Sequence, residues 1–180
     1  MEGPDSKKLK VSESEGKSTA ELPLNLPDFL KKVIETRDIP SDDEIRELEE
    51  AVGFDCKIPS LLFQIAGYDG SLIDISTLEG SDEIPEHYRC KTDVPLIDTD
   101  DMKDNQDYCE EWELPDKILM IGGDGHTNFA LDFRDGKVTD NDDAPVVFIE
   151  TDTMKEVKVA DSFGQFLCML QPFGEEENES

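Results

Sequence analysis

The run KILMIGGDGHTNFALDF, from Lys117 to Phe133, decides the fold. Its first part, Lys117–Gly122, is a short apolar run typical of a strand. In the second part, TNFALDF, larger apolar residues alternate with smaller or polar ones, which is the period of a strand. The dipeptide Asp124-Gly125 between them favours a tight turn. The stretch therefore predicts a β-hairpin.

The residues after this hairpin predict two more strands and a helix. Asp135-Gly136 ends the second strand, PVVFIE (Pro145–Glu150) forms a third, and EVKVA (Glu156–Ala160) forms a fourth. A helix begins at Ser162, where Gln165 completes the pattern of a capping box. Its buried stripe consists of Phe163, Phe166, Leu167 and Leu170.

The residues before the hairpin predict helices first. Leu26 to Ile34 has apolar residues at helical spacing with Pro27 in the first turn, and a second helix runs from Ser41, capped by Glu44, to Gly53. Pro59 opens a third, short and buried helix, and SLIDI at Ser71–Ile75 favours a strand. The order of helices, strands and helix predicts an α+β fold with a central, mostly antiparallel sheet flanked by helices.

Residues 76–116 predict mostly loop, because they contain three prolines and few periodic apolar positions. The two ends of the chain, 1–21 and 174–180, are polar and acidic and have little to bury, so we expect disordered tails there. A single domain over 22–173 remains, which is a usual domain size.

The net charge of −28 limits the classes of partner. Such a chain repels phosphate backbones and anionic lipids, so we expect no nucleic acid and no membrane as partner, and a basic protein instead. No run approaches 18 apolar residues and no export signal is present. Four scattered cysteines predict free thiols in the cytoplasm, and Lys7–Lys10 (KKLK) leaves nuclear access open. The oligomeric state stays open.

Residues that could carry catalysis or hold a metal are few. Cys90 lies three positions from His87, but neither sits in a nucleophile motif, so we expect no enzyme. No cysteine–histidine spacing suits zinc, and we assign neither a metal nor a cofactor. The acidic run from Asp98 to Asp104 leaves calcium binding as an alternative, although Met102 and Lys103 break the EF-hand pattern.

An acidic stretch around Trp112 is the candidate partner-binding segment. Its residues either form a solvated loop around a core tryptophan or a binding face, in which Trp112 or Tyr108 anchors a basic partner and carboxylates steer it. The candidate residues, together with Asp124 of the hairpin turn, are Asp98, Asp100, Asp101, Asp104, Asp107, Tyr108, Glu110, Glu111 and Trp112.

Four stretches of the chain resemble the SUKH superfamily, which includes yeast cell-wall synthesis regulators of the Smi and Knr type and many bacterial toxin-immunity proteins. IGGDGHTNFALDF (Ile121–Phe133) is similar to the family's hairpin, PVVFIETD (Pro145–Asp152) to the strand that follows and VADSFGQFLCML (Val159–Leu170) to its closing helix. DEIRELEEAVGFDCKIP (Asp43–Pro59) resembles the opening helix. Tyr68-Asp69-Gly70 stands where the family often has NGG, and no motif matches 98–116.

This resemblance implies an α+β domain that binds proteins and turns over no substrate. Among bacterial relatives the implied role is neutralising a toxin, and a nuclease toxin would offer a basic surface to this acidic chain. Among eukaryotic relatives it is scaffolding in signalling or ubiquitin-ligase assemblies. Immunity is our leading expectation, and both roles stay open at this point.

Overall fold

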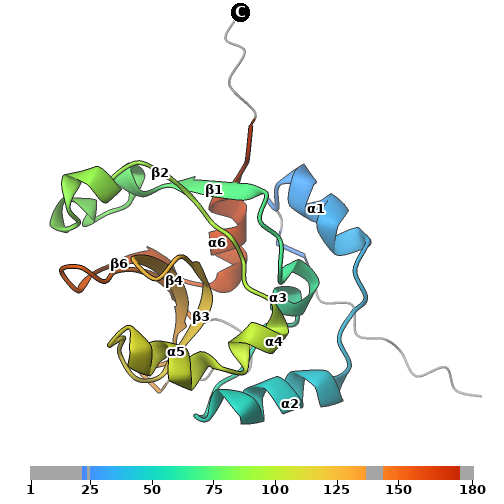
Figure 1. Ribbon diagram of the computed structural model, residues 1–180. Coiled ribbons are helices and arrows are strands. Elements are labelled where there is room, and N and C mark those ends of the chain that lie inside the picture. The colour runs from blue at the N-terminus through green and yellow to red at the C-terminus, as the bar shows by residue number, and fades with distance from the viewer. Residues whose placement is uncertain (1–21, 24, 137–143, 175–180) are drawn as a thin grey trace, which may run out of the picture.

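The computed structural model describes residues 22–23, 25–136 and 144–174. The predicted tail at 1–21, with its KKLK cluster, and all of the predicted tail at 174–180 except Gly174 lie outside these ranges. Within them the chain forms an α+β domain with two antiparallel sheets, as the order of elements predicts (Figure 1).

The larger sheet contains the four predicted strands, in the order β3-β4-β5-β6, and every neighbouring pair is antiparallel. Its strands are β3 (Ile118–Gly123), β4 (Thr127–Asp132), β5 (Val146–Glu150) and β6 (Lys155–Ala160). Phe129 of β4 lies opposite Phe148 of β5, with ring centroids 5.2 Å apart. The predicted hairpin is thus confirmed and forms one edge of the sheet.

The smaller sheet has the order β2-β1-β7 and was only partly predictable. Its strands are β1 (Ser71–Asp74), β2 (Lys91–Asp93) and β7 (Gln171–Pro172). The expected strand at Ser71–Ile75 is confirmed as β1. Because β2 and β7 have only 3 and 2 residues, they carry no alternation that a sequence pattern could reveal.

The predicted helices are confirmed, with small differences at their ends. These are α1 (Asp28–Glu35), α2 (Asp42–Val52), α3 (Ser60–Ile65) and α6 (Phe163–Met169). Pro27 is the residue that precedes α1 and not part of its first turn. The capping box of Ser41 and Glu44 is complete, whereas the Gln165 side chain accepts from the amide of Asp161, one residue before the cap.

The prediction of mostly loop over residues 76–116 was wrong. Besides β2, this region contains α4 (Thr99–Met102), α5 (Asn105–Glu111) and the 3-10 helices η1 (Ile75–Thr77), η2 (Ser81–Glu83) and η3 (Glu86–Tyr88). Each helix is only one or two turns long, so an apolar stripe in it has few positions and is easily missed. Tertiary contacts contribute strongly to the structure of this region.

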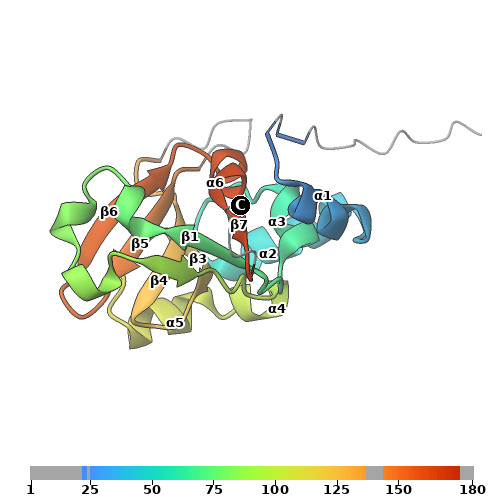
Figure 2. The same ribbon diagram turned by 90° about the horizontal axis from the view of Figure 1, so that it is seen from above.

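The larger sheet is covered on both faces, which explains why β3 and β5 have nearly continuous apolar residues. On one face Phe129, Leu131 and Phe148 join the main core, in which Phe129 packs against Phe166 of α6 at 5.7 Å. On the other face a smaller core forms around Met120, Ala130, Val147 and Ile149, partly beneath α5. Figures 1 and 2 show α5 lying along the β3–β4 side of the sheet.

Candidate functional site

The candidate segment is attached to the sheet through Asn105, the first residue of α5. Its side-chain Nδ2 donates to the Ile118 carbonyl oxygen (2.9 Å), and its Oδ1 accepts from the Met120 amide (2.8 Å). These are the groups of β3 that point away from β4. The buried Asn105 side chain therefore replaces a neighbouring strand along part of this edge.

Two aromatic side chains of the segment attach it further along the hairpin. The Tyr108 hydroxyl donates to Asn128 Oδ1 (2.9 Å), and burial raises the pKa of this hydroxyl. The Trp112 ring packs on Gly125, so closely that a Cβ at position 125 would lie 2.3 Å from it. Because Gly125 also has a φ of +94°, the hairpin turn needs glycine here for two reasons. Trp112 is half-buried and serves the fold.

These attachments show which signal the sequence offered for α5. Asn105, Tyr108, Cys109 and Trp112 have the spacing i, i+3, i+4 and i+7 of one helix face. An asparagine begins this stripe, so a pattern made of apolar residues alone does not include it. An apolar pattern that allowed one buried polar residue would have predicted the helix.

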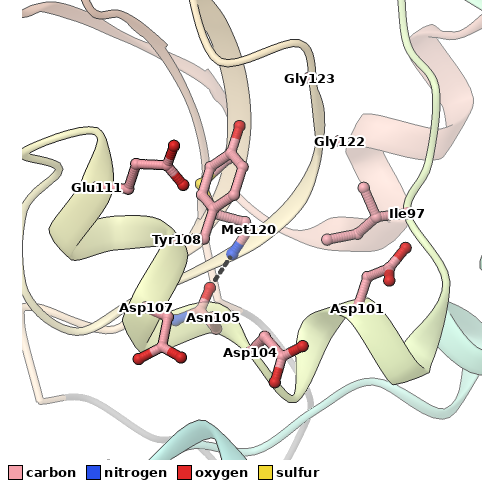
Figure 3. Close-up of a pocket in the computed structure, with 10 residues that line it drawn as sticks. All are labelled: Ile97, Asp101, Asp104, Asn105, Asp107, Tyr108, Glu111, Met120, Gly122 and Gly123. Atoms are coloured by element: carbon pink, nitrogen blue, oxygen red, sulfur yellow. Dashed lines mark hydrogen bonds between the residues drawn. The ribbon is translucent and has the colours of Figure 1, made fainter.

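A groove of about 450 Å³ lies between α4–α5 and the edge of β3 (Figure 3). Apolar groups of Ile97 and Met120 and the backbone of Gly122 and Gly123 line it on the sheet side, and Tyr108 lines it on the α5 side. Four carboxylates complete the lining: Asp101, Asp104, Asp107 and Glu111. The structure thus brings five of the ten predicted residues together around one concave surface.

The groove carboxylates have no cationic partner, and they differ from other unpaired carboxylates in lining one concave surface together. Some carboxylates elsewhere form ion pairs, as Asp100 does with Lys103 (2.8 Å) and Asp132 with Arg134 (2.7 Å). Within the described ranges, none of Asp101, Asp104, Asp107 and Glu111 forms such a pair. Their negative charge is therefore not neutralised by the chain's own described side chains.

The other five predicted residues do not line the groove. Asp98 precedes α4, Asp100 pairs with Lys103, and the Glu110 carboxylate accepts from Gln106 (3.2 Å). Trp112 packs on the hairpin turn. Asp124 accepts from the amides of His126 (3.1 Å) and Thr127 (2.9 Å) and so shapes the turn itself.

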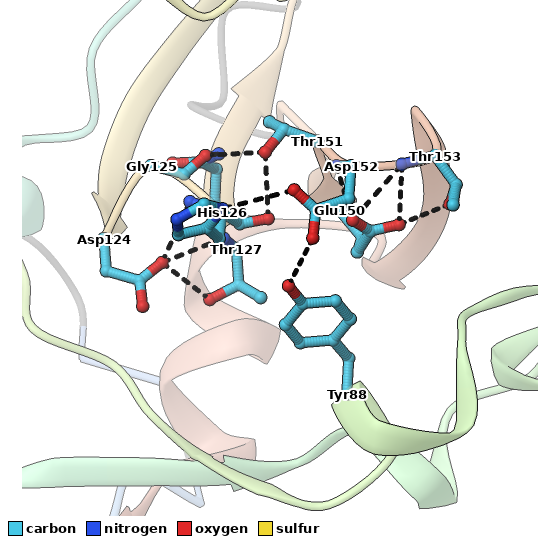
Figure 4. Close-up of polar contacts among 10 residues, drawn as sticks. Tyr88, Asp124, Gly125, His126, Thr127, Glu150, Thr151, Asp152 and Thr153 are labelled. Atoms are coloured by element: carbon cyan, nitrogen blue, oxygen red, sulfur yellow. Dashed lines mark hydrogen bonds and ion pairs between the residues drawn. The ribbon is translucent and has the colours of Figure 1, made fainter.

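A polar network that sequence reasoning missed connects the turns of the larger sheet (Figure 4). Asp152, in the β5–β6 turn, accepts from the Tyr88 hydroxyl of η3 (2.8 Å) and lies 3.2 Å from His126 Nδ1. These two contacts lower the pKa of Asp152, and the charged carboxylate raises the pKa of Tyr88 to about 12. His126 contacts both Asp152 and the Trp112 ring, with 5.6 Å between the ring centroids.

The fully buried Glu150 supports this network from below. Its carboxylate accepts from the amides of Asp152 (2.5 Å) and Thr153 and from the Thr153 hydroxyl. The Thr151 hydroxyl donates to the Gly125 carbonyl oxygen (2.8 Å) and so links this turn to the hairpin. A buried charge needs such partners, and here they fix the β5–β6 turn beside Asp124 and His126.

The geometry also describes the groups considered for catalysis and metal binding. The Cys90 thiol contacts the carbonyl oxygen of His87 (3.8 Å), while the His87 ring packs on Tyr88 at 4.1 Å. All four cysteines are free, as predicted. In the described part of the chain, no three histidine, cysteine or acidic side chains are grouped to hold a metal ion. None of the helices there is long and apolar enough to cross a membrane.

The fold and the groove define an α+β domain with an acidic, non-neutralised concave face. The model of the SMI1 / KNR4 family (SUKH-1) matches residues 39–169, which include the groove and the whole larger sheet. The chain therefore belongs to the SMI1 / KNR4 family (SUKH-1), and the resemblance read from its motifs is confirmed. A search of curated proteins finds no match.

Proposed function

We propose that this chain is a non-enzymatic, cytoplasmic protein-binding domain that neutralises a basic toxin, and that the face of α4 and α5 is its binding site. The gathering of four carboxylates without cationic partners around one groove is the observation that carries the proposal. Membership of the SMI1 / KNR4 family (SUKH-1) supports a role in protein binding, because many relatives are toxin-immunity proteins.

The charge of the chain suits a partner that itself binds phosphates. A nuclease toxin has a cationic surface for its substrate, and an acidic inhibitor can cover that surface. With a net charge of −28, long-range attraction speeds the encounter, and salt weakens the attraction because the Debye length is about 8 Å at physiological ionic strength. The same charge disfavours nucleic acids and anionic membranes as partners.

The test uses the neighbouring gene. If it encodes a secreted protein with a toxic C-terminal domain, we expect co-expression of the full chain to restore growth of cells that produce this domain. Binding of the purified proteins should weaken strongly between 50 mM and 500 mM salt, mainly through a slower association rate.

Two results would contradict the proposal. Growth inhibition that persists at full expression of the chain would exclude neutralisation. Affinity that is unchanged in 1 M salt would exclude the electrostatic basis. A locus with introns and without a toxin gene would instead favour the scaffold role implied by eukaryotic relatives.

A further inference from the structure

We infer that the groove between α5 and β3 receives an arginine side chain of the partner. This inference deepens the proposed function, on which it rests, by stating what the groove recognises. It is carried by the shape of the groove, by the line of carboxylates along it and by the chemistry of its walls.

The shape of the groove suits a long, partly apolar side chain. Its volume of about 450 Å³ lies in the range of sites that take small ligands. Met120 is buried and Ile97 is half-buried, so the sheet side offers an apolar surface to the methylene stem of a basic residue. Such stems pack on apolar surface while the charged head stays near polar groups.

The four carboxylates are spread along the groove and do not surround a single point. Asp101 lies in α4, Asp104 directly precedes α5, and Asp107 and Glu111 lie one turn apart on the same side of α5. All four line the groove, and Figure 3 shows them spread along the α4–α5 segment. Within the described residues no three acidic side chains converge as metal ligands do. The arrangement favours a cation with several donors that can reach more than one carboxylate.

Arginine meets this requirement better than lysine. Its guanidinium has five donors in a planar fork, is weakly hydrated and stacks on aromatic rings, whereas the lysine ammonium is compact and strongly hydrated. Tyr108 provides a ring in the groove wall, held by its hydrogen bond to Asn128. The face of such a ring attracts a cation placed over it.

The test measures peptide binding to the full chain by nuclear magnetic resonance. Three blocked peptides, Gly-Ser-X-Ser-Gly with arginine, lysine or citrulline at X, are titrated at low salt. We expect the arginine peptide to shift the amide signals of Met120, Gly122 and Gly123, and to bind about threefold more tightly than the lysine peptide. Citrulline has nearly the same shape without the charge, so its peptide should leave these signals unchanged.

Matched variants locate the site. The double variant Asp104→Asn/Asp107→Asn should weaken binding of the arginine peptide about threefold to tenfold, since it removes two charges from the line. The control, Glu79→Gln/Asp82→Asn, removes two exposed charges outside the groove lining and should keep the affinity within about twofold. All four positions are exposed, so both variants should fold, and circular dichroism checks this.

Three outcomes would overturn the inference. These are shifts confined to residues outside the groove, a lysine or citrulline peptide that binds as tightly as the arginine peptide, and equal loss of affinity in both double variants. Because no toxin is used, the result is separate from the test of the proposed function. An unresponsive groove in a chain that protects cells contradicts only the inference, whereas groove binding without protection contradicts only the proposed function.

Discussion

The larger sheet and the α4–α5 segment are held in the same domain by different interactions. The sheet buries large apolar side chains on both faces, with Phe129, Phe148 and Phe166 completely inaccessible. The α5 helix is attached by Asn105, Tyr108 and Trp112, of which only Asn105 is buried. The comparison teaches that the sheet supplies stability, while the acidic segment is placed by a few specific contacts that leave its groove carboxylates without cationic partners.

The largest effect should come from a substitution in the apolar core of the larger sheet. Phe129→Ala removes a ring that packs on Phe148 and Phe166, and we expect a loss of about 3–5 kcal/mol in the free energy of unfolding. Urea unfolding followed by circular dichroism measures it. A loss below about 1 kcal/mol would contradict the central role of this cluster.

A smaller, more local effect should follow at the start of α5. Asn105→Ala leaves the Ile118 carbonyl and the Met120 amide without partners at a buried edge. We therefore expect the free energy of unfolding to fall by about 2–3 kcal/mol. Hydrogen exchange should accelerate in α5 more than in β4. Gln106→Ala, at the exposed next position, is the control and should change the free energy of unfolding by less than about 0.5 kcal/mol. Equal effects of both substitutions would refute the role of Asn105 as the attachment.

The contact between the turn and Trp112 can be tested with two glycines. Both Gly125 and Gly136 have a positive φ, but only at Gly125 would a new Cβ meet Trp112. We expect Gly125→Ala to cost about 1–3 kcal/mol and to change the fluorescence of this single tryptophan. Gly136→Ala, which has nothing within 4 Å, should cost less and leave the fluorescence unchanged.

The smallest effect comes from two thiols in the fold. It changes the free energy of unfolding only at alkaline pH. Burial raises the pKa of Cys56, in the main core, and of Cys109, on the side of α5 that packs against the smaller core, to about 11 from a reference value of 9.0. The unfolded chain therefore loses these protons first, and the free energy of unfolding should fall as pH rises from about 9 to about 11. Cys109→Ala should make this decrease shallower, and an unchanged pH profile would contradict the assignment for Cys109.

How well the sequence predicted an element depends on whether apolar burial holds it, as in the larger sheet, or a few specific contacts do, as in the α4–α5 segment. Where burial specifies an element, periodicity is visible: the β3–β4 hairpin, the Ser41 capping box and the stripe of α6 were all predicted correctly. Where a polar side chain holds the position that an apolar one would take, as Asn105 does in α5, a pattern of apolar residues alone does not reveal the element. The strands β2 and β7 were missed because each is defined by its pairing with β1 and not by its own residues.

The residues of the candidate site could be named from the sequence, but their geometry could not. The sequence indicated an acidic face around Tyr108, yet it could not show that Asp101, Asp104, Asp107 and Glu111 line one groove, because this depends on the helical spacing of a region expected to be loop. Nor could it show that Tyr88, His126 and Asp152 meet, since 64 positions separate the first from the last.

The carboxamide of Asn105 has a consequence for how the molecule behaves among its own copies. An open strand at the margin of a sheet is a template on which a second molecule can extend the ladder and start a fibre. Asn105 occupies two outward groups of β3, and the Ile97 amide donates to the Ile121 carbonyl oxygen further along, so this margin is unavailable for such growth. These short-range contacts protect the domain against self-assembly even where salt screens the repulsion between its negative charges.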